Sequence, residues 1–208
     1  MKDIKLPLKD RNIIITRAKD QVSEVKTIFN NAGASVFDLP ALIIDYPDDI
    51  KLLDEVLEQI NKFDWIIFLS SNGIKYVEKR LLTKDSSLKK CSSELKIAVV
   101  GAKTSQYLNN IGVTADYIPP MFIAESLVKH FPSPIKGSHI FIPRVQSGGN
   151  NLIIDEFRSR GALVKELAVY ESRCPKSIPQ ETTNALKNKI IDAILFSSGK
   201  TVKNTAFL

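Results

Sequence analysis

The sequence predicts an α/β fold in which a parallel-sheet domain occurs twice. Short apolar runs alternate with stretches of helical period, which is the pattern of βαβ units. Residues 33–39 and 161–167 also resemble each other, and the same offset of 128 residues (33 to 161) carries DWIIFLS at 64–70 onto DAILFSS at 192–198. A period of this length is the size of a whole domain. We therefore expect a duplicated α/β domain.

The expected strands are short β-branched or apolar runs. Several are apolar throughout, as strands buried on both faces of a parallel sheet are. Pro40 interrupts the run 35–44 and marks a strand end, an edge or a crossing point, because proline cannot donate a ladder hydrogen bond. In chain order the expected strands are residues 12–16, 35–44, 65–69, 97–100, 115–118, 140–142, 163–170 and 193–196.

The expected helices place their apolar residues at helical spacing and so form one apolar face each. Gly33 is expected to end the first of them as a left-handed cap. The segment 84–93 is rich in Ser and Lys and is expected to be a solvated loop. In chain order the expected helices are residues 22–29, 49–61, 74–82, 105–110, 122–131, 152–160 and 181–188.

The composition is that of an ordinary globular chain, with 208 residues, 44% hydrophobic and 25% charged. No apolar run approaches the roughly 20 residues of a membrane span, and residues 1–5 lack the apolar segment of a secretory signal. We therefore expect a cytoplasmic protein without membrane contact. Cys91 and Cys174 lie outside any CxxC spacing and are expected to be reduced and structural, so that no metal site is predicted.

The charge balance favours an anionic partner. The chain carries 29 Lys and Arg against 23 Asp and Glu, for a net charge of +6. The basic residues are scattered, and no motif of a nucleic-acid-binding module accompanies them. Charge alone leaves nucleic acid and small polyanions both open, and the sequence pattern favours the small polyanion.

Hydroxyl-rich and glycine-rich turns follow the expected strands. In open parallel sheets, ligands bind beyond the carboxyl ends of the strands, where helix N-termini offer unpaired N–H groups. Any one such turn is also explained as an ordinary helix N-cap. Five such turns, each after a strand that runs in the same direction, instead indicate a ligand with several carboxylates or phosphates. They are Thr16-Arg17, Ser70-Ser71-Asn72-Gly73, Gly101-Ala102-Lys103-Thr104, Arg144 with Ser147-Gly148-Gly149, and Ser197-Ser198-Gly199.

Familiar catalytic patterns are missing from the sequence. His130 and His139 accompany no nucleophile motif, and neither HExxH nor GxSxG occurs. The turn 101–104 is too short for a P-loop and there is no GxGxxG, which disfavours nucleotide binding. Asp64 and Asp192 precede strands, at the edge opposite the ligand edge, and are expected to be structural.

At these turns the chain resembles the uroporphyrinogen-III synthase family, and the resemblance runs through almost the whole chain in order. Each piece is short, and their order and spacing carry the specificity. The residues concerned are Ile13-Ile14-Ile15-Thr16-Arg17, Gly33-Ala34 with Leu39-Pro40, Phe68-Leu69-Ser70-Ser71-Asn72-Gly73, Val99-Val100-Gly101 with Thr104, Ile142-Pro143-Arg144, Gly161-Ala162 with Val169-Tyr170, and Phe196-Ser197-Ser198.

The resemblance implies two flavodoxin-like parallel-sheet lobes joined by two crossing strands. Residues 1–40 and 171–208 would form the first lobe, and residues 41–170 would form the inserted second lobe. Elements of the first repeat at 96–131 would recur after residue 208. We therefore expect the first lobe to be incomplete, with on the order of 50 residues missing at the C-terminus and little activity in residues 1–208.

The implied activity is the closure of hydroxymethylbilane, a linear tetrapyrrole, into a macrocycle with inversion of ring D. It implies no metal and no cofactor, a monomer, and a site that works chiefly by positioning. Tyr170 matches a VY motif of the family and either assists loss of the substrate hydroxyl or merely packs at the lobe junction. The implied substrate contacts are Thr16, Arg17, Ser70, Ser71, Asn72, Gly101, Thr104, Arg144, Gly148 and Ser198.

The chain departs from the family pattern next to Arg144. Val145 stands where the family has glycine, and Asn150 stands where a further arginine is usual. A second Gly-x-x-Thr turn of the family is also missing. A two-lobed polyanion-binding module without catalysis is the alternative function, since the same turns would support it.

Overall fold

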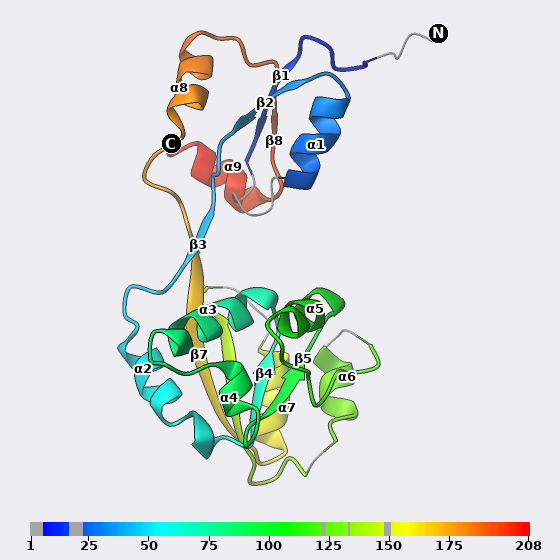
Figure 1. Cartoon of the computed structure of the whole chain (residues 1–208), viewed down its shortest axis with the longest axis vertical. Helices are drawn as coiled ribbons and strands as arrows, with labels where there is room; N and C mark the ends of the chain where they lie inside the picture. The colour runs from blue at the N-terminus through cyan, green and yellow to red at the C-terminus, as the bar shows by residue number, and fades with distance from the viewer. Residues whose placement is uncertain (1–5, 17–22, 122–123, 133, 148–150) are drawn as a thin grey trace. The chain divides into compact units, whose positions relative to one another are not determined.

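A computed structural model describes residues 6–16, 23–121, 124–132, 134–147 and 151–208 (Figure 1). The chain divides into two compact units. Unit 1 comprises Met1–Ile44 and Ser172–Leu208, and unit 2 comprises Asp45–Glu171. Strands pair in parallel in both units and alternate with helices, so the predicted α/β class with parallel sheets is confirmed.

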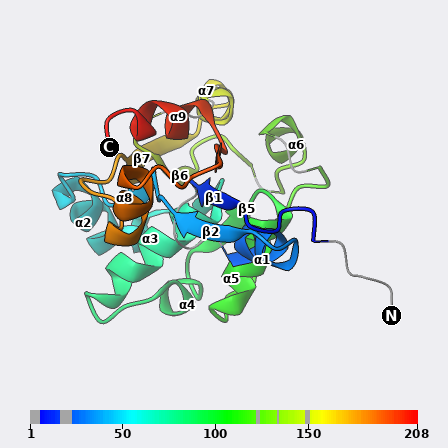
Figure 2. The same ribbon diagram turned by 90° about the horizontal axis from the view of Figure 1, so that it is seen from above.

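Unit 1 contains a three-stranded parallel sheet of order β2-β1-β8. Its strands are β1 (Asn12–Ile15), β2 (Ser35–Asp38) and β8 (Ala193–Leu195). Helices α1 (Ser23–Asn31) and α8 (Gln180–Lys187) lie on opposite sides of these strands in both views (Figure 1, Figure 2). Ile14, Leu39 and Ala41 form the buried cluster of this unit. A last helix, α9 (Gly199–Thr205), follows β8.

The sheet of unit 2 has the order β3-β7-β6-β4-β5. Its strands are β3 (Ile43–Asp45), β4 (Trp65–Phe68), β5 (Lys96–Val99), β6 (His139–Val145) and β7 (Leu163–Arg173). β7, β6, β4 and β5 pair with one another in parallel. β3 and β7 carry the chain across the unit boundaries after residues 44 and 171.

Burial explains why β4 occupies the inside of this sheet. All four of its residues are buried, as the apolar run predicts. Alternate residues of β4 and β6 pack with α6 (Ala124–Lys129) and α7 (Leu152–Ser159) in one core cluster. Helices α3 (Ser71–Leu82) and α5 (Ala102–Asn110) contact each other, and α3 also contacts β4 and β6.

Three sequence-based expectations change in detail. The run 35–44 becomes β2 and β3 with a break around Pro40, where the ladder loses a donor. The segment 84–93 contains a short helix, α4 (Leu88–Cys91), because Ser87 caps it and Leu88 is fully buried. The expected strand 115–118 is a single parallel bridge between Tyr117 and Ala98.

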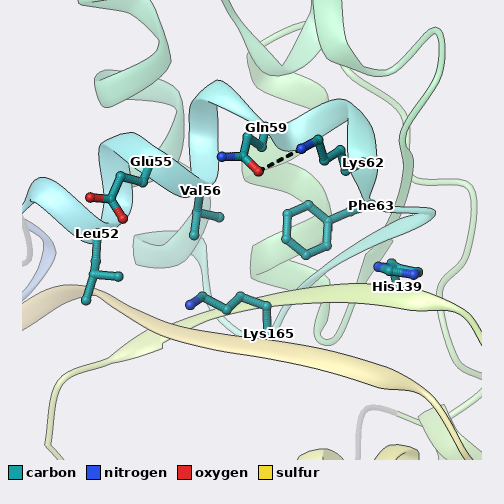
Figure 3. A pocket seen from close by; sticks show the side chains of 8 residues that line it. All are labelled: Leu52, Glu55, Val56, Gln59, Lys62, Phe63, His139 and Lys165. Atoms are coloured by element: carbon teal, nitrogen blue, oxygen red, sulfur yellow. Dashed lines mark hydrogen bonds between the residues drawn. The ribbon is translucent and has the colours of Figure 1, made fainter.

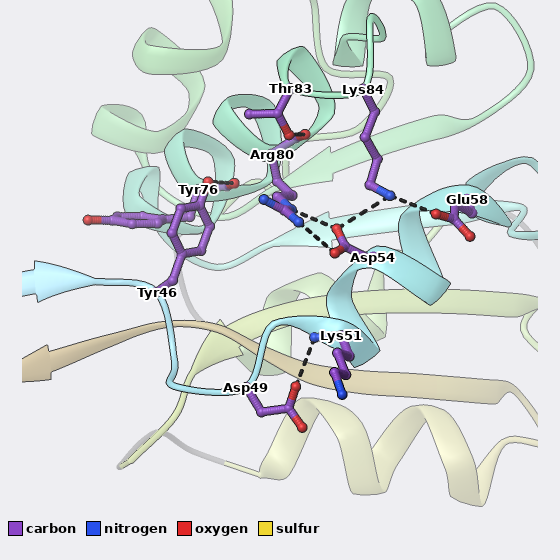
Figure 4. A network of polar contacts seen from close by, with 9 residues as sticks. All are labelled: Tyr46, Asp49, Lys51, Asp54, Glu58, Tyr76, Arg80, Thr83 and Lys84. Atoms are coloured by element: carbon purple, nitrogen blue, oxygen red, sulfur yellow. Dashed lines mark hydrogen bonds and ion pairs between the residues drawn. The ribbon is translucent and has the colours of Figure 1, made fainter.

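One polar network joins helix α2 (Lys51–Glu58) to α3 (Figure 4). The Arg80 guanidinium donates two hydrogen bonds to the Asp54 carboxylate, with an Nε to Oδ1 distance of 2.6 Å. The hydrogen bond from Arg80 holds the pKa of Asp54 below its usual value. Lys84 lies 3.5 Å from Asp54 and 2.6 Å from Glu58. The network fixes α3 against its neighbour.

None of the helices in the described part of the chain combines the length and the apolar character that crossing a membrane requires.

We predict that Arg80→Leu lowers the free energy of unfolding by about 1 kcal/mol at pH 7, since a forked, partly buried ion pair is lost. Ionised Asp54 contributes stability above its unfolded pKa, about 4, and this contribution disappears as pH falls through the lower folded pKa. Urea unfolding should therefore show a difference in the free energy of unfolding between wild type and variant, and this difference should shrink below about pH 4.

The matched control is Glu58→Gln, because Glu58 is 63% exposed and contributes little by pairing with Lys84. A difference between wild type and Arg80→Leu that stayed constant from pH 7 to pH 3 would contradict this role of the ion pair.

Candidate active site

A cavity of about 280 Å³ lies in unit 2 where four parallel strands end. β4 and β5 end just before the cavity residues Leu69, Ser70 and Val100. β6 contributes Pro143, Arg144 and Val145, β7 contributes Tyr170, and α7 contributes Ile153 and Ile154. The cavity therefore occupies the edge at which ligands of open parallel sheets bind.

Tyr170 and Ser70 meet inside this cavity. The Tyr170 hydroxyl lies 3.0 Å from Ser70 Oγ, and either atom can donate the hydrogen bond. Ser70 is also the N-cap of α3, where its Oγ accepts a hydrogen bond of 3.1 Å from the Gly73 N–H. The Ser70 oxygen that contacts Tyr170 is thus also the oxygen that caps α3.

The direction of Tyr170 depends on an irregularity in β7. Arg144 pairs with Ala168, but the next residue of β6, Val145, pairs with Tyr170, so that β7 has one extra residue at this point. Such a bulge re-aims the side chains that follow it. Tyr170 and Val145 both line the cavity as a result.

Arg144 lies in the same cavity and is already paired. Its guanidinium donates to Glu166 Oε2 at 2.6 Å and to Asn151 Oδ1 at 2.8 Å. Arg158 approaches the other Glu166 oxygen at 3.2 Å. The hydrogen bond from Arg144 is the main cause that lowers the pKa of the Glu166 carboxyl. A substrate carboxylate would therefore compete with Glu166 for Arg144.

The remaining walls of the cavity are apolar, which suits a flat ring. Leu69, Val100, Ile153 and Ile154 supply most of this surface. Helices α3 and α7 begin at Ser71 and Leu152, next to the cavity residues Ser70 and Ile153, and helix N-termini favour anions. The site can thus hold an apolar ring, pair a carboxylate with Arg144 and offer a hydroxyl from Tyr170.

Other residues expected at this site lie around it without lining it. Ser71 and Asn72 form the first turn of α3. Gly101 precedes α5 with a positive φ of 104°, a conformation that favours glycine. Thr104 follows on α5 and is only 5% exposed.

Two further expected contacts, Thr16 and Ser198, belong to unit 1. Thr16 is fully buried, and its Oγ1 donates a hydrogen bond of 2.9 Å to the Leu195 carbonyl. Ser198 is the N-cap of α9, in a capping box with Thr201. Each hydroxyl thus has a structural role. Arg17 and Gly148 lie outside the described residues.

Three residues in contact with the cavity residues are not indicated by the sequence pattern, namely Glu166, Asn151 and Tyr76. Glu166 lies within the repeated segment 161–167, where the first copy has Asp38 at the same position. A carboxylate at the same place in both copies is the signal in the sequence that points to Glu166. Asn151 precedes an apolar helix, which is an ordinary place for a polar residue. Tyr76 stacks on Tyr170, with ring centroids 6.0 Å apart, and no local pattern indicates this contact.

A second cavity, of about 320 Å³, lies on the same unit between α2 and the beginnings of β6 and β7 (Figure 3). It is lined by Phe63, His139 and Lys165, among others, and by none of the expected site residues. His139 is the first residue of β6, so this cavity lies at the amino ends of the strands. We assign the site to the cavity at the carboxyl ends for this reason.

Within the described residues, no group of three or more His, Cys, Asp or Glu side chains is arranged to hold a metal ion.

The fold is that of a parallel α/β protein with a cavity at the carboxyl edge of a sheet, the edge at which proteins of this class bind their ligands. The family model described as uroporphyrinogen-III synthase HemD matches residues 23–207. The chain is 43% identical over 198 residues to a uroporphyrinogen-III synthase of Synechococcus elongatus, covering 95% of this chain and 74% of that protein. A uroporphyrinogen-III synthase of Chlorobaculum parvum is 27% identical over 93% of this chain and 77% of its own length.

Solved structures agree with this fold. A mutant uroporphyrinogen-III synthase of Thermus thermophilus superposes with a TM-score of 0.61 at 14% identity, over 93% of this chain and 75% of that one. The enzyme named uroporphyrinogen-III synthetase from Helicobacter pylori gives 0.59 at 15% identity, over 95% and 78%. The chain belongs to the uroporphyrinogen-III synthase family. It is therefore a cyclising lyase of porphyrin biosynthesis, and the resemblance noted in the sequence is confirmed.

We predict that Ser198→Ala lowers the free energy of unfolding of the protein by about 1 kcal/mol, because α9 loses its N-cap. Ser198→Asp should keep the cap and nearly all of the stability. Urea unfolding monitored by circular dichroism measures both variants. Equal losses in Ser198→Ala and Ser198→Asp would show that the hydroxyl is needed for something other than capping.

Proposed function

We propose that the protein closes hydroxymethylbilane into uroporphyrinogen III, with loss of water and inversion of the terminal pyrrole ring D. Membership of the family supports this proposal, and so does one observation in particular. Tyr170, Ser70 and Arg144 meet in an apolar cavity at the carboxyl ends of parallel strands. This combination suits a pyrrole ring that carries carboxylates.

The two units are, in this proposal, flavodoxin-like lobes joined by two crossing strands. Neighbouring strands β2-β1-β8 of unit 1 have the same order as β7-β6-β4 of unit 2 when the repeat offset is applied. Ser70 and Ser198 are equivalent in the repeat, and each caps the helix that follows. These equivalences support a duplication in which one lobe is inserted into the other.

The first chemical step breaks the carbon–oxygen bond of the substrate's hydroxymethyl group. Tyr170 donates a hydrogen bond to the departing oxygen, which takes up a proton and leaves as water, while the adjacent pyrrole nitrogen gives up its proton. The resulting electron-poor carbon is attacked by the substituted carbon of ring D, which gives a spiro intermediate. Fragmentation and reclosure of this intermediate invert the ring. Holding the reacting carbons together accounts for most of the selectivity.

Substrate carboxylates are bound by charge and by backbone N–H groups. Arg144 pairs with one carboxylate by displacing Glu166, and the N-terminus of α3 favours another. A hydrogen bond to a charged group contributes about 1.5 to 3 kcal/mol. Several such contacts would fold the flexible substrate into the conformation that closes. In this proposal a strong catalytic base is not needed.

The deciding experiment incubates the protein with enzymatically produced hydroxymethylbilane and resolves the porphyrin isomers after oxidation. Isomer III is the expected product. Isomer I alone, the product of spontaneous closure, would refute the proposed function.

We predict that Tyr170→Phe lowers kcat on the order of 10²-fold, the lower end of what a proton donor contributes. KM should stay within about threefold, because the phenol acts on the leaving group. Steady-state rates of isomer III formation measure both. Tyr107→Phe is the matched control, since Tyr107 lies on α5 and does not line the cavity. An unchanged kcat in Tyr170→Phe would assign the phenol a packing role.

We predict that Glu166→Gln and Arg144→Leu change KM in opposite directions. Loss of the Glu166 charge frees Arg144 and should lower KM about two- to fivefold, whereas loss of Arg144 should raise it by at least as much. Glu156→Gln is the control, because Glu156 pairs with Arg160 on α7 instead. A rise of KM in Glu166→Gln would mean that Glu166 holds Arg144 ready rather than competing for it.

A further inference from the structure

Three tyrosines from separate segments form one aromatic cluster that ends at the site. The rings of Tyr170 and Tyr76 are stacked, with centroids 6.0 Å apart and planes 25° apart. Tyr46 meets Tyr76 edge to face, at 4.9 Å and 88°. Tyr76 is only 6% exposed, so the middle ring is enclosed. Each such pair restricts the orientation of its rings.

Tyr46, at the end of this cluster away from the site, is hydrogen-bonded to helix α3. The Tyr46 hydroxyl donates a hydrogen bond of 3.1 Å to the Tyr76 carbonyl, and Lys79 Nζ lies 5.5 Å from the Tyr46 ring centroid. Figure 4 shows Tyr46 and Tyr76 beside the Arg80 and Asp54 pair that joins α3 to α2. The Tyr76 ring therefore presents a fixed surface to Tyr170.

The hydroxyl end of Tyr170 is fixed by Ser70. A serine hydroxyl has one proton and two lone pairs, and the Gly73 N–H occupies one lone pair of Ser70 Oγ. Ser70 can then donate its proton to the Tyr170 oxygen at 3.0 Å. In this arrangement none of the described residues accepts the phenol proton, which is available to the cavity. The chain of donors starts at the N-terminus of α3, whose dipole strengthens each donor after it.

We propose that Tyr76 and Ser70 are positioning residues that hold Tyr170 in the geometry of a hydrogen-bond donor. Tyr76 sets the plane of the ring, and Ser70 sets the direction of the phenol proton. This inference rests on the proposed function, in which Tyr170 assists loss of the substrate hydroxyl.

The test is a double-mutant cycle on the single-turnover rate constant, measured with enzyme in excess over hydroxymethylbilane. At saturating enzyme this constant does not depend on the fraction of folded enzyme. Tyr76→Leu and Ser70→Ala should each lower it about tenfold in the wild-type background and less than twofold in the Tyr170→Phe background. Tyr76→Phe and Ser70→Thr, which keep the ring and the hydroxyl, should restore it to within about twofold of wild type.

Two controls separate positioning from stability. Tyr117→Leu removes another packed ring of unit 2, which meets Phe131 edge to face. Ser87→Ala removes another serine cap, that of α4. Both should lower the melting temperature and leave the single-turnover constant unchanged.

Equal slowing by Tyr76→Leu and Ser70→Ala in the wild-type and Tyr170→Phe backgrounds would overturn the inference, because these residues would then act independently of the phenol. A failure of wild type to form isomer III is a separate result and would refute the proposed function itself. Isomer III from wild type together with an unchanged rate in Tyr76→Leu and Ser70→Ala would refute only the positioning of Tyr170.

Discussion

Parallel pairing around β4 is the constraint on which the rest of the structure depends. β4 is buried on both faces and pairs in parallel with β5 and β6. Four strands therefore bring their carboxyl ends to one edge, together with the helix N-termini that follow them. Ser70, Arg144 and Tyr170 meet there because of this topology, although they are far apart in the sequence.

The sequence predicts those features that follow from local pattern. Continuous apolar runs identified β4 and β5, and Gly33 was recognised as a left-handed cap, which its φ of 96° confirms. The repeat relates Ser70 to Ser198, and both serines cap the helix that follows. These predictions succeed because burial on both faces, positive φ and N-capping each restrict the residue type at one position.

Contacts set by packing between distant elements could not be predicted in this way. Tyr76 looks like an ordinary apolar position of α3, and its stacking on Tyr170 depends on how α3 lies against the sheet. The sequence pattern singles out Arg144 as a site candidate, but its pairing with Glu166 depends on the register of β6 and β7. Period and propensity describe one element at a time and contain no information on such register.

Val169 is the extra residue of β7. Successive residues of a strand face opposite sides of the sheet, and a slip by one position exchanges the two faces. Because Tyr170, and not Val169, pairs with Val145, the same residues in a regular ladder would turn the phenol to the other side of the sheet. One inserted residue thus decides the side of the sheet on which the phenol lies.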